Sequence, residues 1–107
     1  MKAWEIWSYQ PVGWPESHPA VIISSDDRVS NKLDINVLMC SSKQATRPAQ
    51  PHEVILDQSD GLSWATLCKC DIIHLVSKAS LTTYRGKVAF ERRRRIIATI
   101  NRANDWV

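Results

Sequence analysis

Residues 63–81, SWATLCKCDIIHLVSKASL, form the longest apolar-rich segment of the chain and contain two of its three cysteines. Val, Ile, Leu, Thr and Trp dominate the segment, and neither Gly nor Pro interrupts it. The pair Asp60-Gly61, just before it, is a turn signal. This pattern predicts a long, half-buried β-strand that can bend near residues 73–76 to serve two sheets.

A lysine and an aspartate in the middle of this segment, Lys69 and Asp71, share one face of the predicted strand. Because burying either charge alone is costly, they require an explanation. One interpretation is an ion pair at the rim of the sheet, and the other is a site that handles a charged substrate. On the opposite face lie Cys68, Cys70 and His74. Zinc usually takes C-x-x-C knuckles at turns, so buried structural cysteines are favoured over a metal site.

The totals describe an ordinary globular chain. With 107 residues, of which 44% are apolar, it is predicted to form a single domain over residues 1–107. No apolar run approaches membrane-spanning length, and the start, MKAWEIW, lacks the apolar core of a signal peptide. Three cysteines, an odd number, indicate reduced thiols rather than a disulfide framework. We therefore expect a cytoplasmic protein without membrane association.

Positive charge is concentrated at the end of the chain. The net charge is +3, and the residues after Leu81 contain seven Lys/Arg against two acidic residues. This asymmetry indicates an anionic partner, either nucleic acid or an acidic protein. The run Glu91 to Arg95 surrounds a helix rather than lining one side, which also fits a simply solvated helix surface.

The remaining pattern predicts a mainly β protein with a C-terminal α-helix. Short strands are expected at residues 3–9, 20–24, 33–40 and 52–57, with turns between them, including residues 24–32. From about Val88 the spacing becomes helical. One side of the helix is predicted to be apolar (Phe90, Ile96, Ile97, Ile100, Ala103) and the other polar (Arg92, Arg95, Thr99, Arg102), with Trp106 docking on the sheet. Five or six strands with one helix suggest a small, strongly bent sheet or barrel.

Two features outside the strands are open to functional interpretation. Trp14 lies in a loop with three prolines, where it either covers the edge of the core or offers an exposed stacking platform for a base. Ser41-Ser42 at a strand end invites a serine hydrolase, but the chain has no G-x-S-x-G elbow and Ser-Ser is common turn chemistry.

In order along the chain, several motifs resemble the MazF/PemK/Kid toxin family. Residues 5–7 (EIW) are similar to its opening strand, and residues 18–24 (HPAVIIS) to its R-P-V-L-V-[IV]-S strand. Residues 37–42 (VLMCSS) resemble its V-x-P-[IV]-T-S strand end, and residues 51–54 (PHEV) the segment around its H-V. Residues 69–71 (KCD) and 77–81 (SKASL) resemble its R-C-D and D-K-S-R-L motifs, and Gly86 followed by a helix fits as well.

The resemblance implies an SH3-like curved β-barrel with a C-terminal helix, usually a homodimer. It also implies the toxin of a type II toxin–antitoxin system, an endoribonuclease that cleaves single-stranded RNA through attack of the ribose 2′-hydroxyl without a metal or other cofactor. The partners would be single-stranded RNA and a cognate antitoxin protein. This chemistry needs a base for the 2′-hydroxyl, an acid for the leaving 5′-oxygen, and cations for the phosphorane charge.

Carried over to this sequence, the resemblance predicts four catalytic residues, namely His18, Ser41, Lys69 and Asp71. RNA contacts are expected from the residues that surround them: Trp14, Ser42, Lys43, Arg47 and His74. The catalytic set is expected to converge in one concave pocket with the Trp14 loop nearby.

The chain departs from the family pattern at its cations. His18 stands where much of the family has an arginine before proline, and His74 replaces a second arginine. Arginine is always charged and forms a bidentate fork for phosphate, whereas histidine is only partly protonated near neutral pH. Three readings therefore remain open. The site is a rearranged ribonuclease, the chain is a catalytically degenerate relative that binds RNA or a protein, or it is an unrelated small barrel.

Overall fold

The computed structural model describes residues 1–106, so Val107, the last residue of the predicted domain, lies outside them. Seven short strands form most of the regular structure of the described residues, and one long helix follows them, which confirms the predicted fold class. In chain order the elements are β1 (Glu5–Tyr9), β2 (His18–Ile22), α1 (Asp26–Asn31), β3 (Asp34–Met39), β4 (Glu53–Leu56), the 3₁₀ turn η1 (Gln58–Asp60), β5 (Thr66–Lys69), β6 (His74–Ser77), the 3₁₀ turn η2 (Lys78–Ser80), β7 (Leu81–Lys87) and α2 (Phe90–Ala103).

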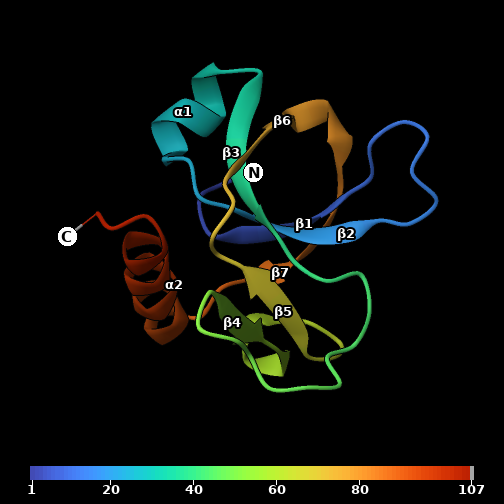
Figure 1. Cartoon of the computed structure of the whole chain (residues 1–107). Helices are drawn as coiled ribbons and strands as arrows, with labels where there is room; N and C mark the ends of the chain where they lie inside the picture. The colour runs from blue at the N-terminus through green and yellow to red at the C-terminus, as the bar shows by residue number, and fades with distance from the viewer. Residues whose placement is uncertain (107) are drawn as a thin grey trace.

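The strands form two antiparallel sheets (Figure 1). Five strands pair in the order β6-β3-β2-β1-β7, and β4 pairs with β5. The two sheets meet at Cys40, just past β3. Its N–H donates to the Pro19 carbonyl of β2 at 2.8 Å, and the residue also forms a bridge with Cys68 of β5. One residue thus belongs to both sheets, and the ends of β2, β3 and β5 are brought together there.

The predicted long strand over residues 63–81 is divided between the two sheets. Its first part is β5 and its second part is β6, with a turn at residues 70–73 rather than 73–76. Cys68 and Cys70 are buried as predicted. Alternation fails beyond them, because the chain leaves the sheet there, and Ile72 is 53% exposed. The expectation that this segment serves two sheets is confirmed.

Apolar side chains lie on both faces of the five-stranded sheet. Val21 of β2 belongs to a core between the sheets and α2, whereas Ala20 and Ile22 belong to a second core on the other face. Because both faces are covered, β2 reads as a continuous apolar run rather than as an alternating one. On β1, Ile6 lies in the first core and Trp7 packs against the second, as its alternation predicts.

Residues 24–32, predicted to be turns, contain the short helix α1. Ser25 is its N-cap and accepts a hydrogen bond from the Arg28 N–H through its side chain. Val29 is buried in the second core. A six-residue helix with one apolar side chain shows too little periodicity to be distinguished from polar turns.

The helix α2 lies beside β4, but its buried side differs from the predicted one (Figure 1). Ile96, Thr99 and Ile100 are buried, whereas Phe90 and Ile97 are 67% and 47% exposed, and Ala103 is also exposed. Thr99 is accommodated because its hydroxyl donates to the Arg95 carbonyl at 2.7 Å. Trp106 is 55% exposed, so the predicted docking on the sheet is also wrong.

The start of α2 is held from outside the helix. Its N-cap residue, Ala89, has no side chain that can cap it. The buried Asp60 takes this role, accepting hydrogen bonds from the Ala89 N–H at 2.8 Å and from Arg92 at 2.7 Å. A carboxylate at a helix N-terminus is favoured by the helix dipole, so Asp60 fixes the position of α2 against η1.

Among residues 1–106, no helix has the length and apolar character that a bilayer crossing requires.

Candidate active site

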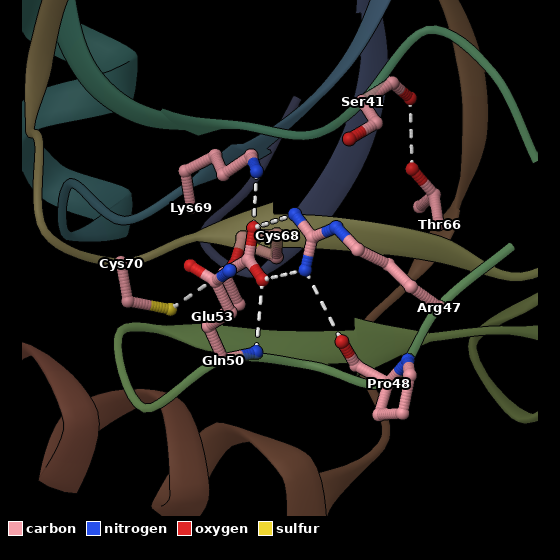
Figure 2. Close-up of polar contacts among 9 residues, drawn as sticks. All are labelled: Ser41, Arg47, Pro48, Gln50, Glu53, Thr66, Cys68, Lys69 and Cys70. Atoms are coloured by element: carbon pink, nitrogen blue, oxygen red, sulfur yellow. Dashed lines mark hydrogen bonds and ion pairs between the residues drawn. The ribbon is translucent and has the colours of Figure 1, made fainter. Parts of the chain in front are cut away.

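A cluster of charged side chains is organised by Glu53, the first residue of β4 (Figure 2). Its side chain has no solvent exposure. Arg47 donates to both carboxylate oxygens, at 2.7 and 2.8 Å, and Lys69 donates to one of them. The Gln50 N–H adds a fourth donor at 2.9 Å. One carboxylate therefore fixes two cations and the loop that carries one of them.

Sheet register explains this cluster. Glu53 and Lys69 are directly paired across β4 and β5, so their side chains emerge on the same face. The hydrogen bonds from Arg47 favour the ionised form of Glu53 and outweigh its burial, and together with those from Lys69 and Gln50 they hold the pKa of Glu53 well below its usual range. The same bond raises the pKa of Arg47. Both cations remain accessible, with side chains 42% and 36% exposed for Arg47 and Lys69.

Lys69 and Asp71 do not form an ion pair with each other. The ion-pair partner of Lys69 is Glu53, whereas Asp71 is exposed in the turn after β5 and forms no ion pair within residues 1–106. An ion pair between Lys69 and Asp71 is therefore wrong, because β5 ends at Lys69 and the chain turns away from the shared face.

Ser41 stands beside this cluster. Its main chain is fixed on both sides by β5, since its N–H donates to the Leu67 carbonyl at 3.0 Å and its carbonyl accepts from the Thr66 hydroxyl at 2.8 Å (Figure 2). Ser41 lines a hollow of about 290 Å³ together with Leu67 and with residues 42–47, which include Ser42, Lys43 and Arg47. Four of the predicted site residues thus share one hollow, but of the predicted catalytic set only Ser41 lines it. Glu53 connects Arg47, at the rim of the hollow, to Lys69.

The loop that carries Trp14 is tied to the same strand end. The Ser42 hydroxyl donates to the Glu16 carboxylate at 2.8 Å. Trp14 packs edge-on against His18, the first residue of β2, with ring centroids 5.5 Å apart, and edge-on against Tyr9. Trp14 is 50% exposed, so it does not close the core. One side of the indole supports the imidazole, and the rest faces solvent.

His74 lies apart from this group. It begins β6 and pairs with Val37, which in turn pairs with Ile22 at the far end of β2 from His18. Four residues along a strand correspond to about 13 Å. His74 is thus separated from His18 along the sheet.

The three cysteines are free and buried. The thiol contact with Cys68 and burial raise the pKa of the Cys70 thiol far above its usual range, which describes an inert core residue rather than a metal-binding thiolate. No three His, Cys, Asp or Glu side chains within residues 1–106 are grouped so as to hold a metal ion. Structural cysteines, the favoured interpretation of the sequence, agree with this placement.

Glu53 was not among the site residues predicted from the sequence. At the start of a short strand it reads as an ordinary solvent-facing acid. Nothing near it in the sequence indicates burial, because its partners lie six residues before it and sixteen residues after it. Only the pairing of β4 with β5 reveals it. Glu16, which anchors the Trp14 loop, was missed for the same reason.

Comparison with solved structures gives several similar folds. One is the Mycobacterium tuberculosis toxin MazF-mt6, with a TM-score of 0.79 and 18% identity over 94% of this chain and 96% of that one. Another is an endoribonuclease in complex with its cognate antitoxin from a mycobacterial species, with a TM-score of 0.81 and 21% identity over 98% and 95%. A mycobacterial endoribonuclease has a TM-score of 0.80 and 20% identity over 98% and 91%.

Comparison with curated protein sequences gives no match to this chain. The family model that describes PemK-like, MazF-like toxins of type II toxin-antitoxin systems, however, matches residues 3–103. As the order of its sequence motifs predicts, the chain belongs to this family.

Proposed function

We propose that this protein is the toxin of a type II toxin–antitoxin system and that it cleaves single-stranded RNA. Family membership supports the class of protein. The observation that carries the activity is the pair of exposed cations, Arg47 and Lys69, held on one buried carboxylate beside the Ser41 hollow. This arrangement suits a phosphate group that approaches from solvent.

The two cations retain donors for a phosphate. Of the five guanidinium N–H groups of Arg47, two bind Glu53 and one binds the Pro48 carbonyl, and of the three ammonium hydrogens of Lys69, one binds Glu53. Glu53 neutralises one of the two positive charges, so the cluster keeps one net positive charge. Donors fixed before the substrate arrives stabilise a developing phosphorane without reorganisation.

The reaction assigns a role to each remaining residue. The ribose 2′-oxygen attacks the adjacent phosphorus, a base takes its proton, and an acid protonates the 5′-oxygen as its bond to phosphorus breaks. His18, held by Trp14, is the proton-transfer group. The Ser41 hydroxyl, which has no hydrogen-bond partner within residues 1–106, binds a phosphate oxygen. Asp71, in the turn after β5, completes the proposed catalytic set. The products are a 2′,3′-cyclic phosphate and a 5′-hydroxyl.

Partners follow from the same proposal. The protein forms a homodimer and is neutralised by a cognate antitoxin, for which an acidic polypeptide is suited by the net charge of +3. The similar endoribonuclease found with its own antitoxin supports this assignment. Light scattering that gives the mass of a monomer at working concentrations would contradict the dimer.

The test is cleavage of a long single-stranded RNA by the purified protein in the presence of EDTA. We expect discrete fragments ending in a cyclic phosphate, with activity lost in Lys69→Ala and His18→Ala and retained in Lys87→Ala, an exposed lysine on β7. Activity that needs an added metal ion would contradict the metal-independent mechanism.

One observation supports a second candidate, a degenerate relative that binds RNA or a protein without cleaving it. Glu53 already occupies both cations, so a phosphate must share them with a carboxylate. Intact RNA from folded protein, with binding that survives Lys69→Ala, would favour this alternative.

A further inference from the structure

A groove lined by two arginines lies between α2 and β4, apart from the Ser41 hollow. It has a volume of about 550 Å³ and is lined by the segment before β4, by β4 itself, and by α2. The helix contributes Arg95, Thr99 and Arg102, and Glu53 lines the other side. No residue of this groove was among the predicted catalytic residues, and the proposed reaction does not use its helical side.

The two arginines are placed as a pair. Arg95 and Arg102 are seven residues apart, which is two helical turns and about 10 Å along the axis, so they project from the same side of α2. Arg102 donates to the Pro51 carbonyl at 2.9 Å, which holds its guanidinium over the groove. The guanidinium of Arg95 has no hydrogen-bond or ion-pair partner within residues 1–106, and both side chains belong to exposed residues.

The groove shares residues with the charged cluster of the candidate active site. Glu53 lines it and also binds Arg47 and Lys69, and Gln50, which lines it as well, donates to Glu53. Because Arg47 and Lys69 more than neutralise Glu53, the acid does not cancel the charge of the two arginines. Glu53 and Gln50 therefore link the two cations of the candidate active site to the groove that carries the two arginines.

We propose that the α2–β4 groove binds backbone phosphates of the single-stranded RNA on one side of the cleaved bond. This inference rests on the proposed function, because it extends the path of that same substrate. Arg95 and Arg102 contact successive parts of the sugar–phosphate backbone. Thr99, which lines the groove between them, does not select a particular base. The groove thus contributes affinity and holds the strand in register, while the chemistry stays at the hollow.

Single-stranded RNA fits this groove better than an acidic polypeptide. Recognition of a peptide that binds as an amphipathic helix uses apolar anchor side chains in a hydrophobic groove. The exposed large apolar residues of α2, Phe90 and Ile97, do not line this groove, and none of its lining residues is an exposed large apolar side chain. What the groove offers is paired guanidinium groups, which match phosphates.

The experiment measures binding by fluorescence anisotropy, using RNA whose 2′-hydroxyls are methylated so that it cannot be cleaved. Two oligonucleotides are compared, of about 4 and about 12 nucleotides, which spans the range bound by small single-strand modules. The variants are Arg95→Gln, Arg102→Gln and the double variant. Arg94→Gln is the matched control for each single variant, since it removes one charge from the same helix at an exposed position that does not line the groove.

We expect the double variant to bind the long oligonucleotide about tenfold more weakly and the short one nearly as well as the wild type. The slope of log K against log salt should fall in magnitude by about 1.4, or 0.7 for each lost phosphate contact. With cleavable RNA, the long substrate should show a raised KM at unchanged kcat. Arg94→Gln should change none of these quantities beyond a small effect on affinity.

Other outcomes overturn the inference. Equal losses in Arg94→Gln would mean that only the overall charge of the helix matters. A long oligonucleotide that binds no better than the short one would remove the groove from the RNA path and leave the proposed cleavage intact. If a poly-glutamate peptide lost affinity in the double variant and RNA did not, the occupant would be an acidic protein. Absence of binding to both oligonucleotides and of cleavage would contradict the proposed function together with this inference.

Discussion

Two buried carboxylates, Glu53 and Asp60, each bind an arginine, but they do so for different ends. Asp60 binds Arg92 and the Ala89 N–H, and both of these groups belong to the start of α2. Glu53 binds Arg47 and Lys69, which stay 42% and 36% exposed, against 21% for Arg92. The difference lies in where the cation sits. A cation between two elements fixes the fold, whereas a cation at the surface stays available to a ligand.

The largest expected effect is that of Asp60→Ala. The substitution leaves the start of α2 without its acceptor and Arg92 with Asp57 as its one remaining acidic partner among residues 1–106, so the free energy of unfolding should fall by about 3 kcal/mol. Urea unfolding followed by tryptophan fluorescence measures it. If Asp60→Ala cost no more than Glu53→Gln, the two clusters would not differ as described.

Gly86→Ala should have the next largest effect on stability. A β-carbon at this position of β7 would overlap the backbone carbonyl of Asp60, which cannot move aside without displacing η1. We expect a loss of about 2 kcal/mol in the free energy of unfolding. Thr83→Ala, an exposed change on the same strand, is the control in thermal unfolding, and an unchanged melting temperature for Gly86→Ala would refute the close contact.

Glu53→Gln should destabilise the protein by about 1.5 kcal/mol at pH 7, because charged hydrogen bonds to Arg47 and Lys69 are replaced by weaker ones. The pKa of Glu53 is lowered in the folded state, so its ionised form contributes stability above the unfolded-state pKa of about 4.3. That contribution is lost as the pH falls through the folded-state value.

The pH dependence distinguishes this effect from simple loss of packing. The stability difference between the wild type and Glu53→Gln should be constant near neutral pH and shrink steadily below about pH 4. Urea unfolding at a series of pH values measures it. A difference that stayed the same from pH 7 into strong acid would show that the charge of Glu53 does not stabilise the fold.

Lys69→Gln should have the smallest effect on stability, less than about 1 kcal/mol, because the side chain is exposed and Arg47 still binds Glu53. RNA cleavage, in contrast, should be lost. A variant that is stable and inactive would separate the two roles most clearly. If Lys69→Gln unfolded the protein, Lys69 would belong with Arg92 as a structural cation.

Much of the fold could be predicted from local patterns. The apolar run at residues 20–24 indicates a buried strand because its side chains are covered on both faces, and Cys68 and Cys70 indicate a buried face by their two-residue spacing. The motif order indicates the family. The phase of α2 was not predictable, because Phe90 and Ile97 fit the helical spacing as well as Ile96 does. Packing against β4 chose between them.

The candidate site, like the fold, has features that the sequence indicated and features that only the tertiary structure decided. By itself the sequence indicated candidate residues for a phosphate site, since Lys69, Ser41 and His18 stand in stretches that resemble the family motifs, next to strands. Only the tertiary structure decided what holds them. Glu53 acquires its role from the register of β4 with β5, and the Trp14 loop reaches the site through Ser42 and Glu16. Local sequence fixes which groups a strand presents, but the partners of a buried charge are set by contacts between segments far apart in the chain, which no local pattern records.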